Sequence, residues 1–197
     1  MVGVPIRSIA VYGTLNRVQG SMAVQKQIAI VGNGPSRELY RPFRGDVCLC
    51  NIPQIDVAYD YISIVDRKAV DYIIKEKLSY QKPILTTDEL AKFLKHTPTQ
   101  AVFKEKLMNS AATAAYYFAH TYDVIWLFGC NALWSNDCTS SQDILIPRPT
   151  RQANLHNRWR EKWQTVWATG KTFVIVCPKD TKPIDYGPNV VWNHSKC

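Results

Sequence analysis

A short apolar run that ends in two closely spaced glycines constrains the fold of this chain more than any other stretch. Residues 28–31 are Ile-Ala-Ile-Val, and Gly32-Asn33-Gly34-Pro35-Ser36 follows them directly. An apolar run bounded by turn residues is typical of a strand that is buried on both faces of a parallel sheet. The glycines allow a close approach of other backbone or of a ligand, and Ser36 is placed to cap a short helix over residues 37–39. In doubly wound α/β folds, a glycine turn after a buried first strand is a place where nucleotides bind.

The turn differs from two common phosphate-binding patterns. No Gly-Lys-Ser/Thr follows it, so it is not a Walker loop, and the third glycine of the dinucleotide fingerprint is missing. A tight strand-to-helix turn without a ligand is therefore the alternative interpretation.

The rest of the chain alternates between short apolar runs and amphipathic stretches. We predict strands over residues 27–31, 46–51, 59–65, 83–86, 124–128 and 171–177. We predict helices over residues 67–77, 89–95, 111–120 and 157–168, with a long loop over residues 132–149. This alternation predicts an α/β fold of three layers, built on a mostly parallel, Rossmann-like sheet. Residues 1–26 are expected to form an N-terminal arm or extension, residues 27–197 a single nucleotide-binding domain, and residues 132–155 a lid or loop within it.

The charge balance favours an anionic partner. The 197 residues include 24 Lys and Arg against 16 Asp and Glu, a formal net charge of +8. Such a balance suits a sugar nucleotide, an acidic glycan, a nucleic acid or an anionic surface.

No apolar run reaches the roughly 18–20 residues that span a bilayer, and the first 26 residues lack a signal-peptide pattern. We therefore expect no membrane span and a cytoplasmic location. The six cysteines include no Cys-x-x-Cys pair, and we expect buried structural thiols rather than disulfides.

Polar side chains follow several of the predicted strands. Asn51 is the last residue of one predicted strand, Asn33 and Asn131 lie two and three residues beyond the ends of two others, and Asn109 and Ser110 stand at the start of a helix. In an open parallel sheet these positions meet along one edge. Amides both donate and accept hydrogen bonds, which suits a pyrimidine base or ribose, and a helix start suits a phosphate. The alternative is that asparagine follows strands because it favours turns.

His156 and Asp66 are the remaining candidates for chemistry. His156 precedes the helix predicted over residues 157–168. Partial positive charge at the amino end of a helix disfavours an imidazolium, so a neutral His156 can accept a proton from a substrate hydroxyl. A solvated surface histidine is the alternative. Asp66 and Asp60 could hold magnesium, but the chain lacks an Asp-x-Asp pattern, and we expect no metal.

These stretches, in this order, resemble a known family. The Val-Gly-Asn-Gly-Pro-Ser turn and the Cys50-Asn51 strand end resemble the start of the bacterial sialyltransferases that modify lipooligosaccharides. Asn109-Ser110-Ala111 and Gly129-Cys130-Asn131 are similar to that family's Thr-Ser-Gly and Gly-Ile-Asp stretches. His156, followed by Cys177-Pro178, resembles the histidine that the family uses as a base. The resemblance spans about residues 27–180.

The resemblance implies a function. It implies a Rossmann-like domain with a lid, and metal-independent transfer of a sugar from a CMP-linked donor to an acceptor hydroxyl, with no cofactor. His156 would be the general base. The residues that would bind the nucleotide are Gly32, Asn33, Gly34, Ser36, Asn51, Asn109, Ser110, Gly129 and Asn131.

The chain also departs from that family. The family stabilises its leaving phosphate with tyrosines, where this chain offers Trp134 and Ser135. The arginine that the family carries before its Thr-Ser is also missing, and the cation nearest to Asn109-Ser110 is Lys106. We expect Arg148 and Arg151 to take the place of the tyrosines, because cations at a leaving phosphate serve the same purpose. The acceptor could be a glycan or a nucleic acid. Three alternatives stay open: a DNA-modifying glycosyltransferase of the same fold, a magnesium-dependent pyrophosphokinase with a similar glycine turn, and a non-catalytic nucleotide- or nucleic-acid-binding module.

Overall fold

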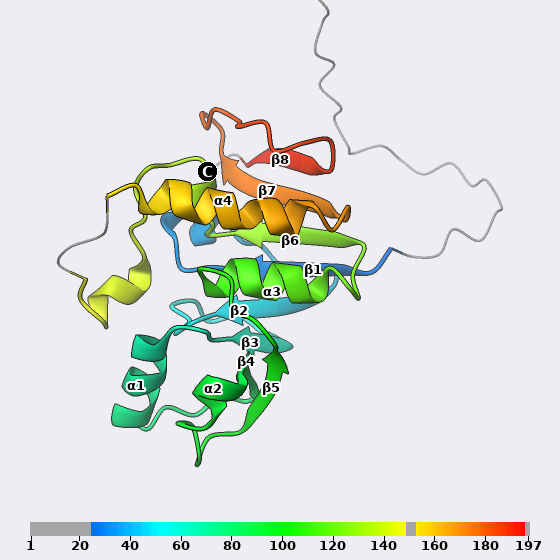
Figure 1. Ribbon diagram of the computed structural model, residues 1–197. Coiled ribbons are helices and arrows are strands. Elements are labelled where there is room, and N and C mark those ends of the chain that lie inside the picture. Colours follow the sequence, from blue (N-terminus) through cyan, green and yellow to red (C-terminus); the bar gives the residue numbers. More distant parts are fainter. Residues whose placement is uncertain (1–24, 149–152, 196–197) are drawn as a thin grey trace, which may run out of the picture.

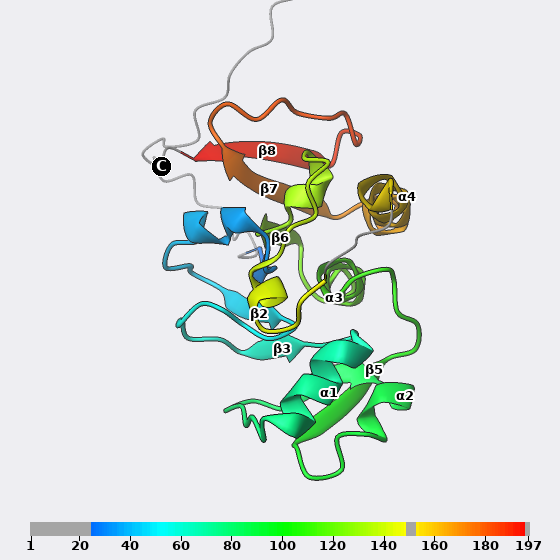
Figure 2. The same cartoon turned by 90° about the vertical axis from the view of Figure 1, so that its left-hand side faces the viewer.

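A computed structural model describes residues 25–148 and 153–195, which form one parallel β-sheet with helices packed against it (Figures 1 and 2). The strands are β1 (Gln27–Val31), β2 (Asp46–Cys50), β3 (Tyr61–Ser63), β4 (Ile84–Thr87), β5 (Thr99–Phe103), β6 (Val124–Phe128), β7 (Thr172–Pro178) and β8 (Val190–Ser195). The α-helices are α1 (Arg67–Lys75), α2 (Asp88–Ala91), α3 (Ser110–Phe118) and α4 (Leu155–Trp167). Three short 3₁₀ helices are η1 (Pro35–Leu39), η2 (Asn131–Leu133) and η3 (Ser141–Ile144).

The order of the strands places β1 and β6 at the centre of the sheet. The eight strands run β5-β4-β3-β2-β1-β6-β7-β8, and every neighbouring pair is parallel. The chain moves outward from β1 to β5, returns through α3 to β6 on the other side of β1, and then moves outward to β8. In an open parallel sheet, the point where the strand order reverses in this way leaves a crevice at the carboxyl ends of the strands.

The two faces of the sheet carry different layers. α3 and α4 lie side by side over the central strands, and η1 lies on the opposite face (Figures 1 and 2). Alternate residues of β1 point to opposite faces. Ile28 and Ile30 pack into the large core beneath the helices, whereas Ala29 and Val31 pack with Leu39 of η1. The predicted α/β fold with a Rossmann-like parallel sheet is confirmed.

The tryptophans of α4 anchor that helix to the core. Trp163 and Trp167 are buried and stack with their ring centroids 4.8 Å apart, and Trp167 also packs on Phe173 of β7 at 4.9 Å. The amphipathic helix predicted here is confirmed, but it begins at Leu155. His156 therefore lies within its first turn rather than before it.

The sequence analysis missed both edge strands. In β5 only Phe103 is buried, and β8 contains no buried residue. An edge strand lacks the two-sided apolar run by which the central strands were recognised. The strand predicted over residues 59–65 is also shorter in the structure, where β3 covers Tyr61–Ser63.

The prediction that Ser36 caps a short helix is wrong. The 3₁₀ helix η1 begins at Pro35, and its N-cap is Gly34, which has no side chain to accept a hydrogen bond. The Ser36 side chain is instead engaged by Asn131, 95 residues further along the chain.

The cysteines of the described part are buried free thiols, as predicted: Cys48, Cys50, Cys130, Cys138 and Cys177. Cys197 and the expected N-terminal arm, apart from residues 25 and 26, lie outside the described residues.

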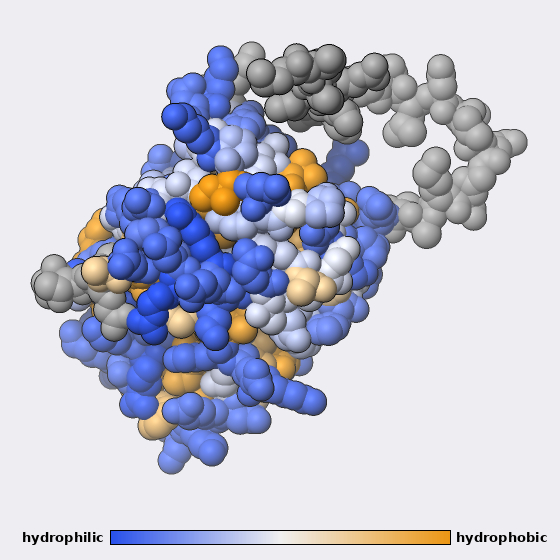
Figure 3. Space-filling model, turned by 45° about the horizontal axis from the view of Figure 1, so that its top comes forward, coloured by the Kyte–Doolittle hydropathy of each residue, from blue (hydrophilic) through white to orange (hydrophobic). Residues whose placement is uncertain are grey.

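In the part that is described, no helix combines the length and the apolar character that crossing a membrane requires. Figure 3, in which the top of Figure 1 is turned toward the viewer, shows a face that is mostly hydrophilic with small, separate hydrophobic areas.

The buried Tyr80 hydroxyl makes stability sensitive to alkaline pH. It has no hydrogen-bond partner among the described residues, and burial raises the pKa of Tyr80 from 10.0 to about 12, with smaller contributions from Tyr59 and Tyr72. The unfolded chain therefore loses this proton first, and stability present below pH 10 falls as the pH rises toward 12. We expect Tyr80→Phe to flatten this fall. At pH 7 the variant should equal or exceed the wild type by up to about 1–3 kcal/mol, because an unpaired buried hydroxyl is removed.

Urea denaturation at pH 7 and at intervals from pH 9 to 11.5 measures both effects. Tyr116→Phe is the matched control, because the Tyr116 side chain is 40% exposed. Equal pH profiles for the Tyr80→Phe variant and the wild type would contradict the assignment of this alkaline loss of stability to Tyr80.

Candidate functional site

The turns that follow β1 and β6 touch each other through their backbones. The Gly32 amide donates to the Phe128 carbonyl at 2.8 Å, and the Gly34 amide donates to the Gly129 carbonyl at 2.9 Å. A Cβ at Gly32 would lie 2.7 Å from the Gly129 oxygen. Gly129 itself has a φ of +65°, and a Cβ there would overlap the Gly32 carbonyl. Glycine is therefore required on both sides of this contact.

Asn131 reinforces the contact. Its Oδ1 accepts hydrogen bonds from the Ser36 amide at 3.0 Å and from the Ser36 hydroxyl at 2.7 Å. A Cβ at Gly34 would lie 2.5 Å from the same Asn131 oxygen. Ser36 and Asn131 thus hold the two turns together.

Asn33 and Asn51 link the ends of the neighbouring strands. The Asn33 Nδ2 donates to the Cys50 and Ile52 carbonyls, both at 3.1 Å. Asn51 has a φ of 55°, which asparagine tolerates better than most residues. Its Oδ1 accepts from the Ser110 hydroxyl at 2.6 Å. The side chains predicted to converge are thus brought together at the end of the central strands.

Two adjoining chambers open beside these groups. The first has a volume of about 90 Å³ and the second about 210 Å³. They share five lining residues: Asn51, Asn109, Ser110, Ser140 and Trp159. Eight of the nine residues predicted to bind a nucleotide line the first chamber: Gly32, Asn33, Gly34, Asn51, Asn109, Ser110, Gly129 and Asn131. The exception is Ser36.

Several polar groups around the first chamber have no hydrogen-bond partner among the described residues. Within the described part of the chain, no hydrogen bond uses the Asn33 Oδ1 or the Asn51 Nδ2. The side chain of Asn109 caps α3 by accepting from the Ala112 amide at 2.9 Å, and in the same ranges no bond is made by the first two amides of the helix, on Ser110 and Ala111. Helix amides in this position bind anions. The chamber thus offers one acceptor and several donors.

A segment after β6 covers the chambers. The Ser141 amide donates to the Asn33 carbonyl at 2.8 Å, and Gln142 Oε1 accepts from the Ile52 amide at 3.2 Å. Arg160 of α4 donates to the Ala132 and Ser135 carbonyls at 2.7 and 2.9 Å. This cover, residues 131–148, occupies most of the segment that was predicted to be a lid or loop. Residues 149–152, including Arg151, lie outside the described residues.

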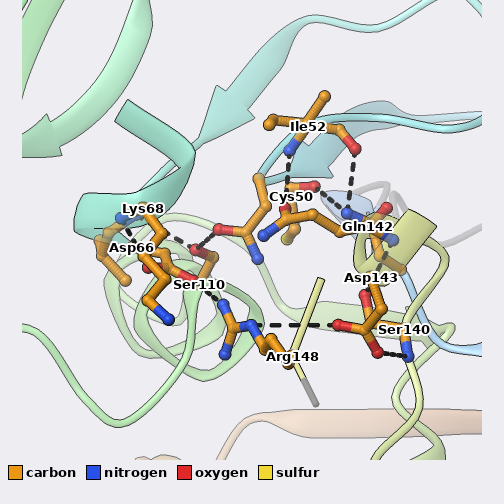
Figure 4. Close-up of polar contacts among 12 residues, drawn as sticks. Cys50, Ile52, Asp66, Lys68, Ser110, Ser140, Gln142, Asp143 and Arg148 are labelled. Carbon is orange, nitrogen blue, oxygen red and sulfur yellow. Dashed lines mark hydrogen bonds and ion pairs between the residues drawn. The ribbon is translucent and has the colours of Figure 1, made fainter. Parts of the chain in front are cut away.

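Charged groups of both signs line the second chamber. The Arg148 guanidinium lies between Asp66, with which it forms an ion pair, and Asp143, whose Oδ1 is 3.9 Å from Arg148 Nε (Figure 4). Asp66 also caps α1 by accepting from the Lys68 amide at 3.0 Å. Lys106 is exposed and lines the same chamber.

Two of the thiols that line the first chamber, Cys50 and Cys130, are favoured in the neutral form. Burial and the neighbouring Cys50 raise the pKa of Cys130, and a hydrogen bond with Cys48, together with burial, raises the pKa of Cys50. Neutral thiols are poor nucleophiles and poor metal ligands. In the described ranges, no group of three or more His, Cys, Asp and Glu side chains is placed to hold a metal ion.

His156 stands apart from the amide groups. It is half-buried and lines neither chamber, whereas Trp159, three residues later on α4, lines both. Residues three apart lie on the same side of a helix. The role of His156 as a base stays a prediction.

Sequence reasoning missed Gln142, Asp143 and Trp159 as lining residues. Trp159 precedes Trp163 and Trp167 by four and eight residues, a spacing typical of the core-facing side of a helix rather than of a binding site. Gln142 and Asp143 lie in a stretch without a periodic pattern, and no signal in the sequence placed them at the cleft.

Comparisons of the chain with protein-family models, with curated proteins and with solved structures find no match.

Alanine substitutions at Gly129 and Gly170 distinguish the cost of overlap with another backbone segment from the cost of a left-handed backbone conformation. Both have positive φ, +65° and +73°, but a Cβ at Gly170 would meet nothing within 4 Å. We expect Gly170→Ala to cost about 1–2 kcal/mol, the price of the left-handed conformation alone. Gly129→Ala should cost several kcal/mol more or prevent folding, because the two turns must separate. Denaturant unfolding of both variants measures the difference. Equal losses would show that the contact between the turns is dispensable.

Proposed function

We propose that the chain is a glycosyltransferase that moves a sugar from a nucleotide-activated donor to an acceptor hydroxyl. One observation carries the proposal: two glycine turns, an amide pair and a helix start open into one chamber where the strand order reverses. This combination suits a nucleotide because it offers groups for a base or ribose beside donors for a phosphate. The resemblance to the sialyltransferases, which rests on the same residues, supports the proposal as well.

Each open group has a place in this proposal. The Asn33 Oδ1 would accept from a donor on the base or ribose, and the Asn51 Nδ2 would donate to an acceptor. The amides of Ser110 and Ala111 would bind the phosphate nearest the sugar. The close contact of the glycine turns would let the ligand approach the backbone without meeting side chains.

The reaction would proceed by displacement at the anomeric carbon. The acceptor oxygen forms a bond to that carbon, the bond between the carbon and the phosphate oxygen breaks, and its electron pair leaves with the phosphate. The proton of the acceptor hydroxyl passes to the His156 imidazole. Arg148, together with Arg151, would offset the charge that develops on the leaving phosphate.

Nucleotide binding tests the first half of the proposal. We expect CMP to raise the melting temperature, with ATP and added magnesium having little effect, because the resemblance implies a CMP-linked donor. Asn51→Asp keeps the oxygen that accepts from Ser110 but removes the open donor. It should weaken nucleotide binding by about 1–3 kcal/mol, roughly 10- to 100-fold.

Asn136→Asp is the matched control, since this exposed residue of the cover lines neither chamber. Equal binding by both variants would remove Asn51 from the site. Stabilisation by ATP that requires magnesium would favour the pyrophosphokinase alternative instead.

Measuring turnover tests the second half of the proposal, the transfer of the sugar. We expect His156→Ala to lower kcat by about 10²- to 10⁴-fold, the usual contribution of a general base, with nucleotide affinity unchanged. His120→Ala is the control, because His120 lies just beyond the carboxyl end of α3 and lines neither chamber. Rates of donor consumption measure the effect across pH 5–9. Nucleotide binding without turnover in the wild type would favour a non-catalytic binding module.

A further inference from the structure

The second chamber is built from different residues than the first. Besides the five shared residues, it is lined by Val65, Asp66, Lys106, Met108, Gln142, Asp143 and Arg148. None of these belongs to the glycine turns or to the nine residues predicted to bind the nucleotide, and only Arg148 already has a place in the proposed reaction, at the leaving phosphate. The chamber adjoins the start of α3, where the proposed phosphate would bind. Its position is therefore that of the group attached to the phosphate.

Gln142 presents an unused donor to this chamber. Its side chain is buried, with an exposed fraction of 3%, and its Oε1 accepts from the Ile52 amide at 3.2 Å. No hydrogen bond within the described part of the chain uses its Nε2, and the residue lines the second chamber. Buried polar groups in proteins are nearly always paired. A buried amide that faces a chamber with its donor open points to a ligand that accepts a hydrogen bond there.

The formal charges around the chamber balance. The carboxylates of Asp66 and Asp143 stand against the cations of Arg148 and Lys106. An added carboxylate would face two negative side chains, and an added ammonium would face two positive ones. Desolvating such a charge without a dedicated partner is unfavourable. The chamber therefore favours an uncharged group.

The remaining lining suits hydroxyl groups on a ring. A hydroxyl both donates and accepts, which matches the open amide donor of Gln142 beside the carboxylates of Asp66 and Asp143. Trp159 adds a flat aromatic wall that is only half-buried and faces both chambers. Such a wall packs against the apolar face of a ring.

We propose that the second chamber is the subsite for the transferred sugar and that it takes an uncharged, polyhydroxylated ring of the hexose type. This inference rests on the proposed function and adds the class of sugar to it. It differs from the acidic sugar that the resemblance to sialyltransferases implies. The reason lies in residues that are not part of the motifs carrying that resemblance, namely Asp66, Gln142 and Asp143.

Two donors that differ in a single carboxylate test the inference. UDP-glucose and UDP-glucuronate share their nucleotide and most of their sugar, and UDP alone measures the contribution of the nucleotide. Titration calorimetry with the full chain should give UDP-glucose at least a tenfold lower Kd than UDP-glucuronate. CMP and CMP-sialate form a second series, in which the acidic sugar should bring no gain over CMP.

Gln142→Glu sharpens the test. It keeps an oxygen for the Ile52 amide but replaces the open donor by an acceptor. We expect about a tenfold loss of UDP-glucose affinity, with the affinity for UDP unchanged, an outcome that simple disruption of the cover would not give. Gln54→Glu is the control: it makes the same change of charge near Ile52 on a side chain that lines neither chamber.

The outcomes separate the two proposals. If the nucleotides bind but the acidic sugar binds as tightly as glucose or tighter, the inference is overturned and the nucleotide site stands. The inference is also overturned if Gln142→Glu binds UDP-glucose like the wild type. If no nucleotide or sugar nucleotide binds, the proposed function fails and the inference fails with it.

Discussion

The backbone contact between Gly32 and Gly129 is the constraint on which the rest of the site depends. β1 and β6 are the strands from which the chain departs in opposite directions, so their turns would normally diverge and leave a wide crevice. Here two reciprocal glycines bring the turns together, and the Ser36–Asn131 pair holds them. The crevice is narrowed to a small chamber, whose wall includes the backbone of the two turns and the amide side chains that follow the neighbouring strands.

Those amides serve the fold and the cleft at once. Asn33 donates from its side-chain nitrogen to carbonyls at the end of β2 and just beyond it, and Asn51 uses its oxygen on Ser110. Gln142 uses its oxygen on Ile52. In each case one end of the amide stabilises the strand ends and the other end is left open to a chamber. Stability and binding are therefore coupled at these positions, and a truncation to alanine would confound them. Isosteric changes between amide and carboxylate separate the two roles.

Structural features that depend on the local sequence pattern were predictable, whereas features that depend on contacts between distant segments were not. β1, β2 and β6 were predictable because burial on both faces leaves an apolar run, and the sheet topology then placed Asn33, Asn51 and Asn131 together. β5 and β8 carry no such run because they lie at the edges. Ser36 suited a helix cap by local rules, but Asn131 offered its hydroxyl a long-range partner. Gln142 could not be assigned because its place depends on how the cover folds back over β1 and β2.

The net charge of the chain and the charge of the cleft act at different ranges. A formal +8 attracts anions over distances of about a Debye length, roughly 8 Å at physiological salt, and it does so without regard to chemistry. Inside the second chamber, contacts of a few ångströms decide, and there Asp66 and Asp143 offset Arg148 and Lys106. A basic protein can thus bind a neutral sugar, because the positive excess is satisfied by the phosphates of the donor or by an anionic acceptor. Net charge accordingly affects how readily anions approach the protein, whereas the paired carboxylates and the open amide of Gln142 govern which sugar ring can occupy the second chamber.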